Sequence, residues 1–310
     1  MGKTKESIKK GNRKKWWLYS IVTLLVVCLA GGFSLWSKVY ETYPYPAPRP
    51  EATAGITNWL ILGTDDYDYH KQTGRADSIM VMSIAEETGD IVMLSLPRDS
   101  RLEKKAAETR KLGEVMYYGG TEQMIAVVER LLDIPLDGYV HTNLIGLEQI
   151  VDGLGGVDIR VPFAMEVRTS EPRWVDLEPG INRLDGRLAL AYLRFRSDRE
   201  ADFGRMRRHR EFLTALFQQA LRIRNTLRLP MIARRASEHI KTDITITEGL
   251  WFARLFRRID FSDIAMVQAK GRPKNLDGTP YVLLDGDFLK RMVAVYIRRT
   301  EDKSILEDAE

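Results

Sequence analysis

An uninterrupted apolar run near the N-terminus places the strongest constraint on how this chain can fold. Residues 16–36 read WWLYSIVTLLVVCLAGGFSLW and contain no charged residue. This length suits a helix that crosses a lipid bilayer, and the tryptophans at its ends suit the two membrane interfaces. We therefore expect a transmembrane helix over residues 16–36.

The residues before this run set its orientation. Residues 1–15 carry seven of the 47 Lys and Arg residues, and Glu6 is their only acid. Positive charge flanking a membrane helix stays in the cytoplasm, so everything after residue 36 is expected outside the cell. The chain is then a single-pass protein of the cell membrane. The alternative is a signal peptide that is cleaved near Ala30-Gly31-Gly32.

The body of the chain is not generally basic. Outside the tail, 40 basic residues face 42 acidic ones, so the net charge of +4 belongs to the N-terminus. We therefore expect no nucleic-acid partner. Cys28 is the only cysteine and lies inside the apolar run. The outer part is accordingly expected to have neither a disulfide nor a thiolate metal site.

Composition divides the chain further. Residues 43–50 read YPYPAPRP, and proline at alternate positions fixes an extended, polyproline-like segment. The expected organisation is a cytoplasmic basic tail (1–15), a transmembrane helix (16–36), a Pro-rich extracellular stalk (37–55), a folded outer domain (56–300) and an acidic C-terminal tail (301–310).

Within residues 56–300, strand and helix patterns alternate. Asp77 to Glu86 and Asp90 to Leu96 flank the turn Glu87-Thr88-Gly89, which predicts an antiparallel hairpin. Further strands are expected at 58–62, 157–161, 263–268 and 281–284. Helices are expected at 121–132, 143–154, 184–193, 203–224 with Asp202 as N-cap, in the region before 263, and at 287–298. The predicted fold class is α/β, a mixed-sheet α/β sandwich.

Charged residues follow or precede three of these strands. Asp65 follows the first strand, Arg75 and Asp77 lead into the second, and Arg98 and Asp99 follow the third. If these points meet at one sheet edge, all five side chains share a pocket, and paired carboxylates with arginines suit a magnesium-assisted phosphate site. The alternative is that the acids cap turns and that Arg98 and Asp99 form a structural ion pair.

A second cationic segment lies at Leu193 to Arg210, which contains seven arginines in eighteen positions. Arginine presents a planar fork of donors that fits phosphate. Arg194 and Arg196 share a face if the chain is extended, and Arg205 and Arg208 do so if it is helical. The segment predicts a site for a polyanion, and a solvated basic helix face is the alternative.

Other motifs are weaker or absent. Lys111, Tyr117 and Tyr118 precede Gly119-Gly120 at a helix start, where backbone N–H groups could hold an anion. The four histidines lack metal-site spacing such as H-E-x-x-H, and the chain has neither a G-x-S-x-G nor a Walker motif. Serine hydrolase and P-loop functions therefore lack support.

Taken in order, these segments resemble the LytR-CpsA-Psr (LCP) family of membrane-anchored cell-envelope phosphotransferases. The segments that carry the resemblance are ILGTDD (61–66), GRADS (74–78), SLPRDS (95–100), KLGEVMYYGG (111–120), VDGLGGVDI (151–159), LDGRLALAYLRFR (184–196) and DFGRMRRHR (202–210). The resemblance covers about residues 56–300.

The resemblance implies a magnesium-dependent enzyme, with Mn²⁺ as the other candidate ion. It would move a glycopolymer of the teichoic acid or capsule type from a polyprenyl-pyrophosphate carrier to peptidoglycan and form a phosphodiester. Asp65 and Asp77 match the family's metal-binding aspartates, and Asp99 and Asp202 its acidic partners. The residues that match its pyrophosphate-binding cations are Arg75, Arg98, Lys111, Arg194, Arg196, Arg205 and Arg208.

Three departures from the family pattern stand out, and the first is mild: Ala76 and Ser78 stand where Ser and Thr are usual. His209 stands where glutamine is common, and Gly113 replaces a usual asparagine. Either Asp99 or Asp77 could accept the proton of the attacking hydroxyl beside Arg98. The alternatives to transfer are an extracytoplasmic polyanion- or lipid-binding regulator without turnover and a polyprenyl-pyrophosphate hydrolase.

The isoprenoid tail of such a carrier needs an apolar tunnel. The apolar helix faces at Met124 to Leu132 and Leu144 to Val151 could line it, and core packing is the other interpretation of these faces. Met80, Met82 and Met93 alternate within strands and are interpreted as core.

Overall fold

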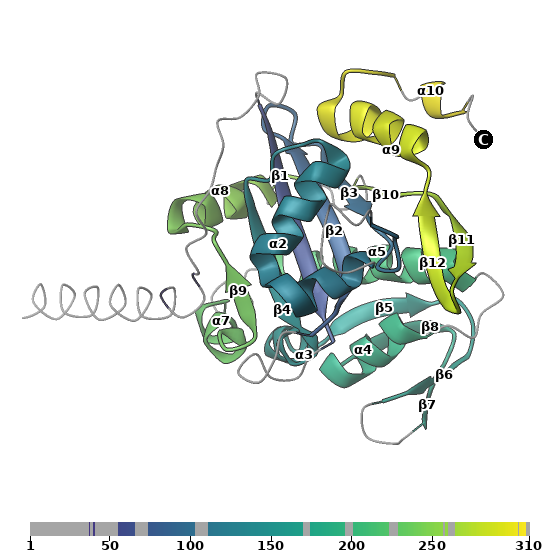
Figure 1. Ribbon diagram of the computed structural model, residues 1–310. Helices are drawn as coiled ribbons and strands as arrows, with labels where there is room; N and C mark the ends of the chain where they lie inside the picture. The colour runs from purple at the N-terminus through teal and green to yellow at the C-terminus, as the bar shows by residue number, and fades with distance from the viewer. Residues whose placement is uncertain are drawn as a thin grey trace, which may run out of the picture.

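The computed structural model (Figure 1) describes Ser37, Tyr40 and residues 55–65, 74–102, 111–169, 174–195, 201–222, 229–256, 258–259, 264–302 and 304–307. Among these residues, none of the helices has the length and apolar character that crossing a membrane requires. The expected basic tail and transmembrane helix lie outside the described residues and stay predictions.

A mixed six-stranded sheet forms the centre of the structure. Its spatial order is β10 (Ala265–Gln268), β3 (Ile91–Ser95), β2 (Ala76–Ala85), β1 (Ile56–Thr64), β4 (Gly138–Asn143) and β9 (Ile240–Thr242). β1 pairs antiparallel with β2 and parallel with β4, and β2 pairs antiparallel with β3. β10 is parallel to β3, and β9 is antiparallel to β4. The expected hairpin is confirmed, and Gly89 takes the left-handed conformation (φ 77°) in its turn.

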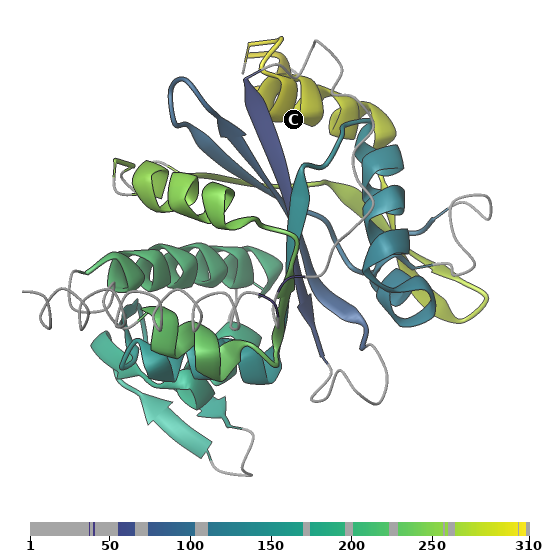
Figure 2. The same ribbon diagram turned by 90° about the vertical axis from the view of Figure 1, so that its left-hand side faces the viewer.

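Both faces of this sheet are covered, as its nearly continuous apolar strands require. On one face, Leu60 and Leu62 of β1 pack with helices α2 (Val115–Leu132) and α9 (Gly286–Met292) and with the π-helical turn Val293–Arg298. On the other face, Trp59 and Met82 pack with α5 (Ala201–Leu221) and α8 (Ile246–Phe256). Figure 2 shows these two helical layers on opposite sides of the sheet.

A smaller unit packs against the outer side of α5, where Phe212 joins its core. Its elements are α3 (Leu144–Gly153), β5 (Val157–Val161), β6 (Met165–Arg168), β7 (Trp174–Leu177), β8 (Gly180–Leu184) and α4 (Gly186–Arg194). The remaining elements are α7 (Leu229–Ala236), the hairpin β11 (Gly271–Leu276) and β12 (Thr279–Leu284), and α10 (Ser304–Glu307).

The expected mixed α/β class is confirmed, and several local predictions are wrong. α5 begins at Ala201, so Asp202 lies in its first turn rather than at its N-cap. The helix expected from residue 121 begins at Val115 and continues through a kink at Gly120, whose φ of 64° and ψ of −163° only glycine adopts readily. β4, β6, β7, β8, β9 and β11 were not expected from the sequence.

Candidate anion site at the sheet edge

The three charged strand ends do meet at one edge of the central sheet. β1 and β3 run in the same direction and β2 runs between them in the opposite one, so the end of β1, the start of β2 and the end of β3 are neighbours. The Asp65 N–H donates to the Arg75 carbonyl oxygen at 3.1 Å, and the Arg75 N–H donates to Asp65 Oδ1 at 2.8 Å. Asp65, Arg75 and Asp77 are all exposed at this edge.

A β-bulge sets the position of Asp77. Ser78 pairs with Gly63 and Ala76 pairs with Thr64, so Asp77 has no counterpart on β1. Ala76 lies in the same buried cluster as Ile79 and Val81. In a regular strand, position 77 would share the face of Ile79 and Val81 because side chains alternate. The bulge thus keeps the Asp77 carboxylate out of the core and presents it at the sheet edge.

Ion pairs link the aspartates with the cations of the following loop. Arg98 Nη1 donates to Asp77 Oδ1, and Arg98 Nε lies 3.6 Å from Asp99 Oδ2. Lys111 Nζ donates to the other oxygen of Asp99 at 2.7 Å. Burial lowers the pKa of Arg98, but its bonds to the two aspartates outweigh burial and leave this pKa above the ordinary value. The residues Asp77, Arg98, Asp99 and Lys111 are called the edge cluster below.

The backbone at Gly113 packs closely against the backbone of the edge cluster. The Gly113 N–H donates to the Arg98 carbonyl oxygen at 2.8 Å. A Cβ on Gly113 would lie 2.7 Å from the Ala76 carbonyl oxygen and 3.1 Å from Arg98 Cβ. Only glycine fits here, which gives a structural reason for this departure from the family pattern.

Tyr281 of β12 is a neighbour of the edge cluster that the sequence did not indicate. Lys111 Nζ lies 5.5 Å from the centre of its ring, a cation–π distance. The Val282 N–H donates to the Asp99 carbonyl oxygen at 2.8 Å, so β12 also fixes the backbone of the loop. No local sequence pattern indicates this contact, because β12 is far from residue 99 in the chain and reaches it only in the folded protein.

The arginine-rich segment is described only in part. Arg194 is exposed in the last turn of α4 and lies near Glu148 of α3. Burial raises the pKa of Glu148, and Arg187 and Arg194 partly offset the rise. Arg196 and the side chains of Asp202, Arg205 and His209 lie outside the described residues. Their expected approach to a pyrophosphate therefore stays a prediction.

Arg208 is inside the protein. Its side chain is fully buried, Nη2 donates to the Phe195 carbonyl oxygen at 2.7 Å, and its guanidinium carbon lies 5.4 Å from the Phe195 ring centre. Phe195 directly follows Arg194 at the end of α4, so Arg208 links the end of α4 to α5. Its expected contact with pyrophosphate remains a prediction.

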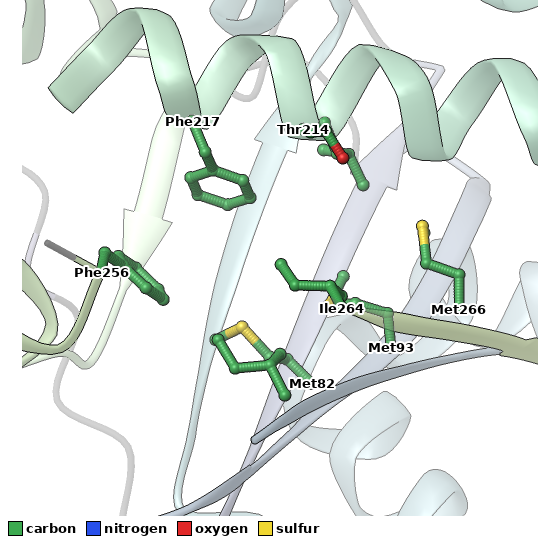
Figure 3. A pocket seen from close by; sticks show the side chains of 9 residues that line it. Met82, Met93, Thr214, Phe217, Phe256, Ile264 and Met266 are labelled. Carbon is green, nitrogen blue, oxygen red and sulfur yellow. The ribbon is translucent and has the colours of Figure 1, made fainter. Parts of the chain in front are cut away.

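An apolar pocket lies between α5 and the sheet face that carries Met82 and Met93 (Figure 3). It is narrow, with a cavity volume of about 10 Å³. Its lining residues are Met82, Ile91, Met93, Leu213, Thr214, Phe217, Phe256, Ile264 and Met266. The two helix faces expected to line a tunnel are elsewhere. Met124 and Val128 of α2 pack into the core on the opposite sheet face, and Leu147 and Val151 of α3 pack into the core of the smaller unit.

A mixed α/β sheet that gathers arginine–aspartate ion pairs at one edge defines an α/β protein with a charged candidate site at that edge. Residues 38–295 match the model of the LytR_cpsA_psr family. The chain therefore belongs to the LytR-CpsA-Psr family, as the ordered motifs indicated.

Named relatives are similar over most of the chain. Polyisoprenyl-teichoic acid–peptidoglycan teichoic acid transferase TagV of Bacillus subtilis (strain 168) is 30% identical over 78% of this chain and 67% of its own length. The transferase of the same kind named TagU, from Halalkalibacterium halodurans, is 31% identical over 75% of each chain. The crystal structure of B. subtilis TagV superposes with a TM-score of 0.66 at 28% identity, over 78% of this chain and 97% of that one.

Proposed function

We propose that this protein is a membrane-anchored phosphotransferase that moves a glycopolymer of the teichoic acid or capsule type from a polyprenyl-pyrophosphate carrier to peptidoglycan. The observation that carries the proposal is the edge cluster, in which Arg98 is held between Asp77 and Asp99 with Lys111 beside them. The two relatives named as teichoic acid–peptidoglycan transferases support the substrate class.

The proposed reaction is a displacement at phosphorus. A muramic-acid hydroxyl of peptidoglycan attacks the phosphorus that carries the glycopolymer, and a new P–O bond forms. The bond from this phosphorus to the bridging pyrophosphate oxygen breaks, and polyprenyl monophosphate leaves with that oxygen. The hydroxyl proton passes to Asp99 or Asp77. Arg98 and Lys111 stabilise the charge that builds on the phosphate oxygens.

The ion pairs prepare Arg98 for this role. A guanidinium held by two carboxylates has a fixed orientation before the substrate binds, so less conformational entropy is lost on binding. Because its pKa is above the ordinary value, Arg98 remains charged throughout the physiological pH range. Arg75, exposed beside Asp65, is the neighbouring cation that could contact the second phosphate.

The donors at the edge suit Mg²⁺ or Mn²⁺. Among the described residues, no cluster of three or more His, Cys, Asp or Glu side chains could hold a metal alone. Mg²⁺ typically takes one or two carboxylates together with substrate phosphates, and Asp65 and Asp77 offer two from adjacent strand ends. A bound ion would supply charge neutralisation at the pyrophosphate oxygens.

Asp65→Asn should weaken Mn²⁺ binding, which electron paramagnetic resonance measures. The unfolding midpoint of the variant serves as a control for folding.

The methionine-lined pocket is the part of the described structure that we assign to the start of the polyprenyl tail. It is apolar, and its methionines can change rotamers to admit a chain. The pocket is narrow here, so a bound tail requires α5 to shift or these side chains to rearrange.

The test is a coupling assay with the full chain in nanodiscs, a polyprenyl-pyrophosphate oligosaccharide, Mg²⁺ and peptidoglycan fragments. We expect a phosphodiester-linked product by mass spectrometry, and its loss in Arg98→Ala. The matched control is Arg183→Ala, because Arg183 forms a comparably exposed ion pair with Asp158 (42% and 38% exposed, against 43% and 44% for Arg98 and Asp77).

The other outcomes identify the alternatives. Bound lipid without any product would favour a regulator, and polyprenyl phosphate released without coupling to acceptor would favour a hydrolase. Full activity in Arg98→Ala would remove the edge cluster from the mechanism.

A further inference from the structure

Helix α7 has an exposed face that combines an apolar side chain with two cations. Met231, Arg234 and Arg235 are exposed at positions i, i+3 and i+4, so they share one side of the helix. Met231 is 48% exposed. The opposite side is buried through Ile232 and Ala236. The exposed side is therefore amphipathic, whereas the inner side is tied to the protein core.

Helix α8 repeats this combination. Leu250 is 56% exposed, and Arg254, one turn later, is exposed on the same side. Phe252 is buried and Trp251 half-buried, and both pack in the cluster beneath the central sheet. Residues 229–258 contain six Lys and Arg residues against three acids, Glu238, Asp243 and Glu248.

The two helices flank the edge at which the N-terminal segment reaches the fold. β9, the edge strand between α7 and α8 in the chain, forms a parallel bridge from Thr242 to Tyr40. Figure 2 shows α7 and α8 on the same side of the molecule. Tyr40 is four residues beyond the apolar run that ends at Trp36. Four residues of extended chain span at most about 14 Å, so the fold cannot stand far from the end of that run.

We propose that the exposed face of α7 and α8, formed by Met231, Arg234, Arg235, Leu250 and Arg254, rests on the anionic headgroups of the outer membrane leaflet. The proposal rests on the membrane anchor of the proposed function. Arginines next to exposed apolar side chains are the combination with which helices lie in a membrane interface, and the short tether holds this face near the bilayer. Since Phe256 of α8 also lines the methionine pocket, the pocket wall then lies next to the lipid phase.

The test uses the full chain with Cys28→Ser, so that one introduced cysteine carries an environment-sensitive fluorophore. Met231→Cys and Leu250→Cys report on the proposed face, and Ile181→Cys, 71% exposed on β8, is the control. The variants are placed in nanodiscs of phosphatidylcholine alone or with an equal part of phosphatidylglycerol. A nitroxide-labelled lipid headgroup serves as quencher.

In discs with phosphatidylglycerol we expect blue-shifted emission and several-fold stronger quenching at positions 231 and 250 than at 181. Replacing Arg234, Arg235 and Arg254 by glutamate should return both positions to the level of the control, with an unchanged unfolding midpoint. If the glutamate variant unfolds, the glutamine variant takes its place and should show the same loss.

Equal quenching at all three positions would overturn the proposal. A blue shift without quenching would do so as well, because a protein partner or a second copy would then cover the face. Strong quenching that persists in phosphatidylcholine alone would overturn the assignment to anionic headgroups. The readout does not depend on transfer, so contact without coupling activity would count against the proposed reaction alone.

Discussion

Arg98 contacts two carboxylates, Asp77 and Asp99, which reach it from different strand ends. Its value to the site depends on this geometry as well as on its charge. A guanidinium has five donors in a plane and can bind a phosphate while it keeps one carboxylate, whereas an ammonium is a point charge.

Arg98→Lys should therefore fall between the wild type and Arg98→Ala. We expect kcat to drop about 100-fold or more in the alanine variant, the size seen when one transition-state donor is removed, and by less in the lysine variant. Steady-state kinetics of coupling measure both. Equal rates for lysine and arginine would show that charge alone matters here.

Asp243 is a second residue whose surroundings change its chemistry, at a place remote from the edge cluster. Burial raises its pKa from 3.8 to about 6, although Oδ1 accepts the Tyr139 N–H at 2.7 Å. The unfolded chain ionises this carboxyl more readily than the folded one. Protonated Asp243 therefore favours the folded state. This contribution to the free energy of unfolding is complete below about pH 4 and is lost as the pH rises through about 6.

Asp243→Asn should cancel this contribution to the pH dependence. The amide oxygen can still accept the Tyr139 N–H, and the side chain carries no charge to desolvate. We expect the variant to unfold at a higher temperature than the wild type near pH 7 and at a similar one near pH 4. A difference in midpoint that stays constant between these two pH values would contradict the argument.

At the scale of elements, α5 connects the two parts of the fold. It packs on the central sheet through Leu213 and on the smaller unit through Phe212, and Arg208 ties it to the residue after α4. The hydrogen bond from buried Arg208 to the Phe195 carbonyl oxygen thus links α5 to the end of α4.

Arg208→Met should test how much this hydrogen bond stabilises the fold. It keeps much of the length of the side chain and removes the bond to the Phe195 carbonyl oxygen, which we expect to cost about 2 kcal/mol of unfolding free energy. Urea unfolding measures the loss. A residue that serves only as a pyrophosphate ligand would instead weaken donor binding and leave the urea midpoint unchanged.

Elements with local signals were predictable, and others were not. The β2–β3 hairpin has a glycine turn between apolar runs, and α3 has Asn143, whose side chain accepts the Gly146 N–H as an N-cap. β11 (GRPKNL) has almost no apolar residue, so nothing in its sequence marks it as a strand. The site followed the same rule: strand direction placed Asp77 near Arg98, whereas Tyr281 reaches Lys111 only through tertiary packing.

At the scale of the whole molecule, the two faces of the sheet are filled differently. One face packs into a continuous core with α2 and α9, and the other leaves a narrow pocket beneath α5. The strand alternation of Met82 and Met93 shows which way they face. Both are buried, which confirms their interpretation as core, but the alternation cannot show that the covering helix also leaves a pocket beside them.

Filling this pocket should weaken the binding of lipid donors with a long polyprenyl chain and leave the binding of short-chain donors unchanged. Thr214→Phe places a ring where Figure 3 shows the threonine beside the pocket, and Thr214→Val is the control of equal size. We expect about tenfold weaker binding of a long-chain polyprenyl pyrophosphate, the equivalent of roughly two buried methylenes at about 0.8 kcal/mol each. A two-isoprene analogue should bind unchanged. Equal weakening of both would place the tail elsewhere.

Asp77 is a residue that the sheet itself does not need. Without Asp77, Ala76 and Ser78 would be consecutive residues, just as their partners Thr64 and Gly63 on β1 are consecutive. Ala76 would still face the same core as Ile79. A chain one residue shorter could thus form the same ladder and the same core. Inserting or deleting this one residue would therefore add or remove the carboxylate and leave the ladder and the core of the sheet unchanged.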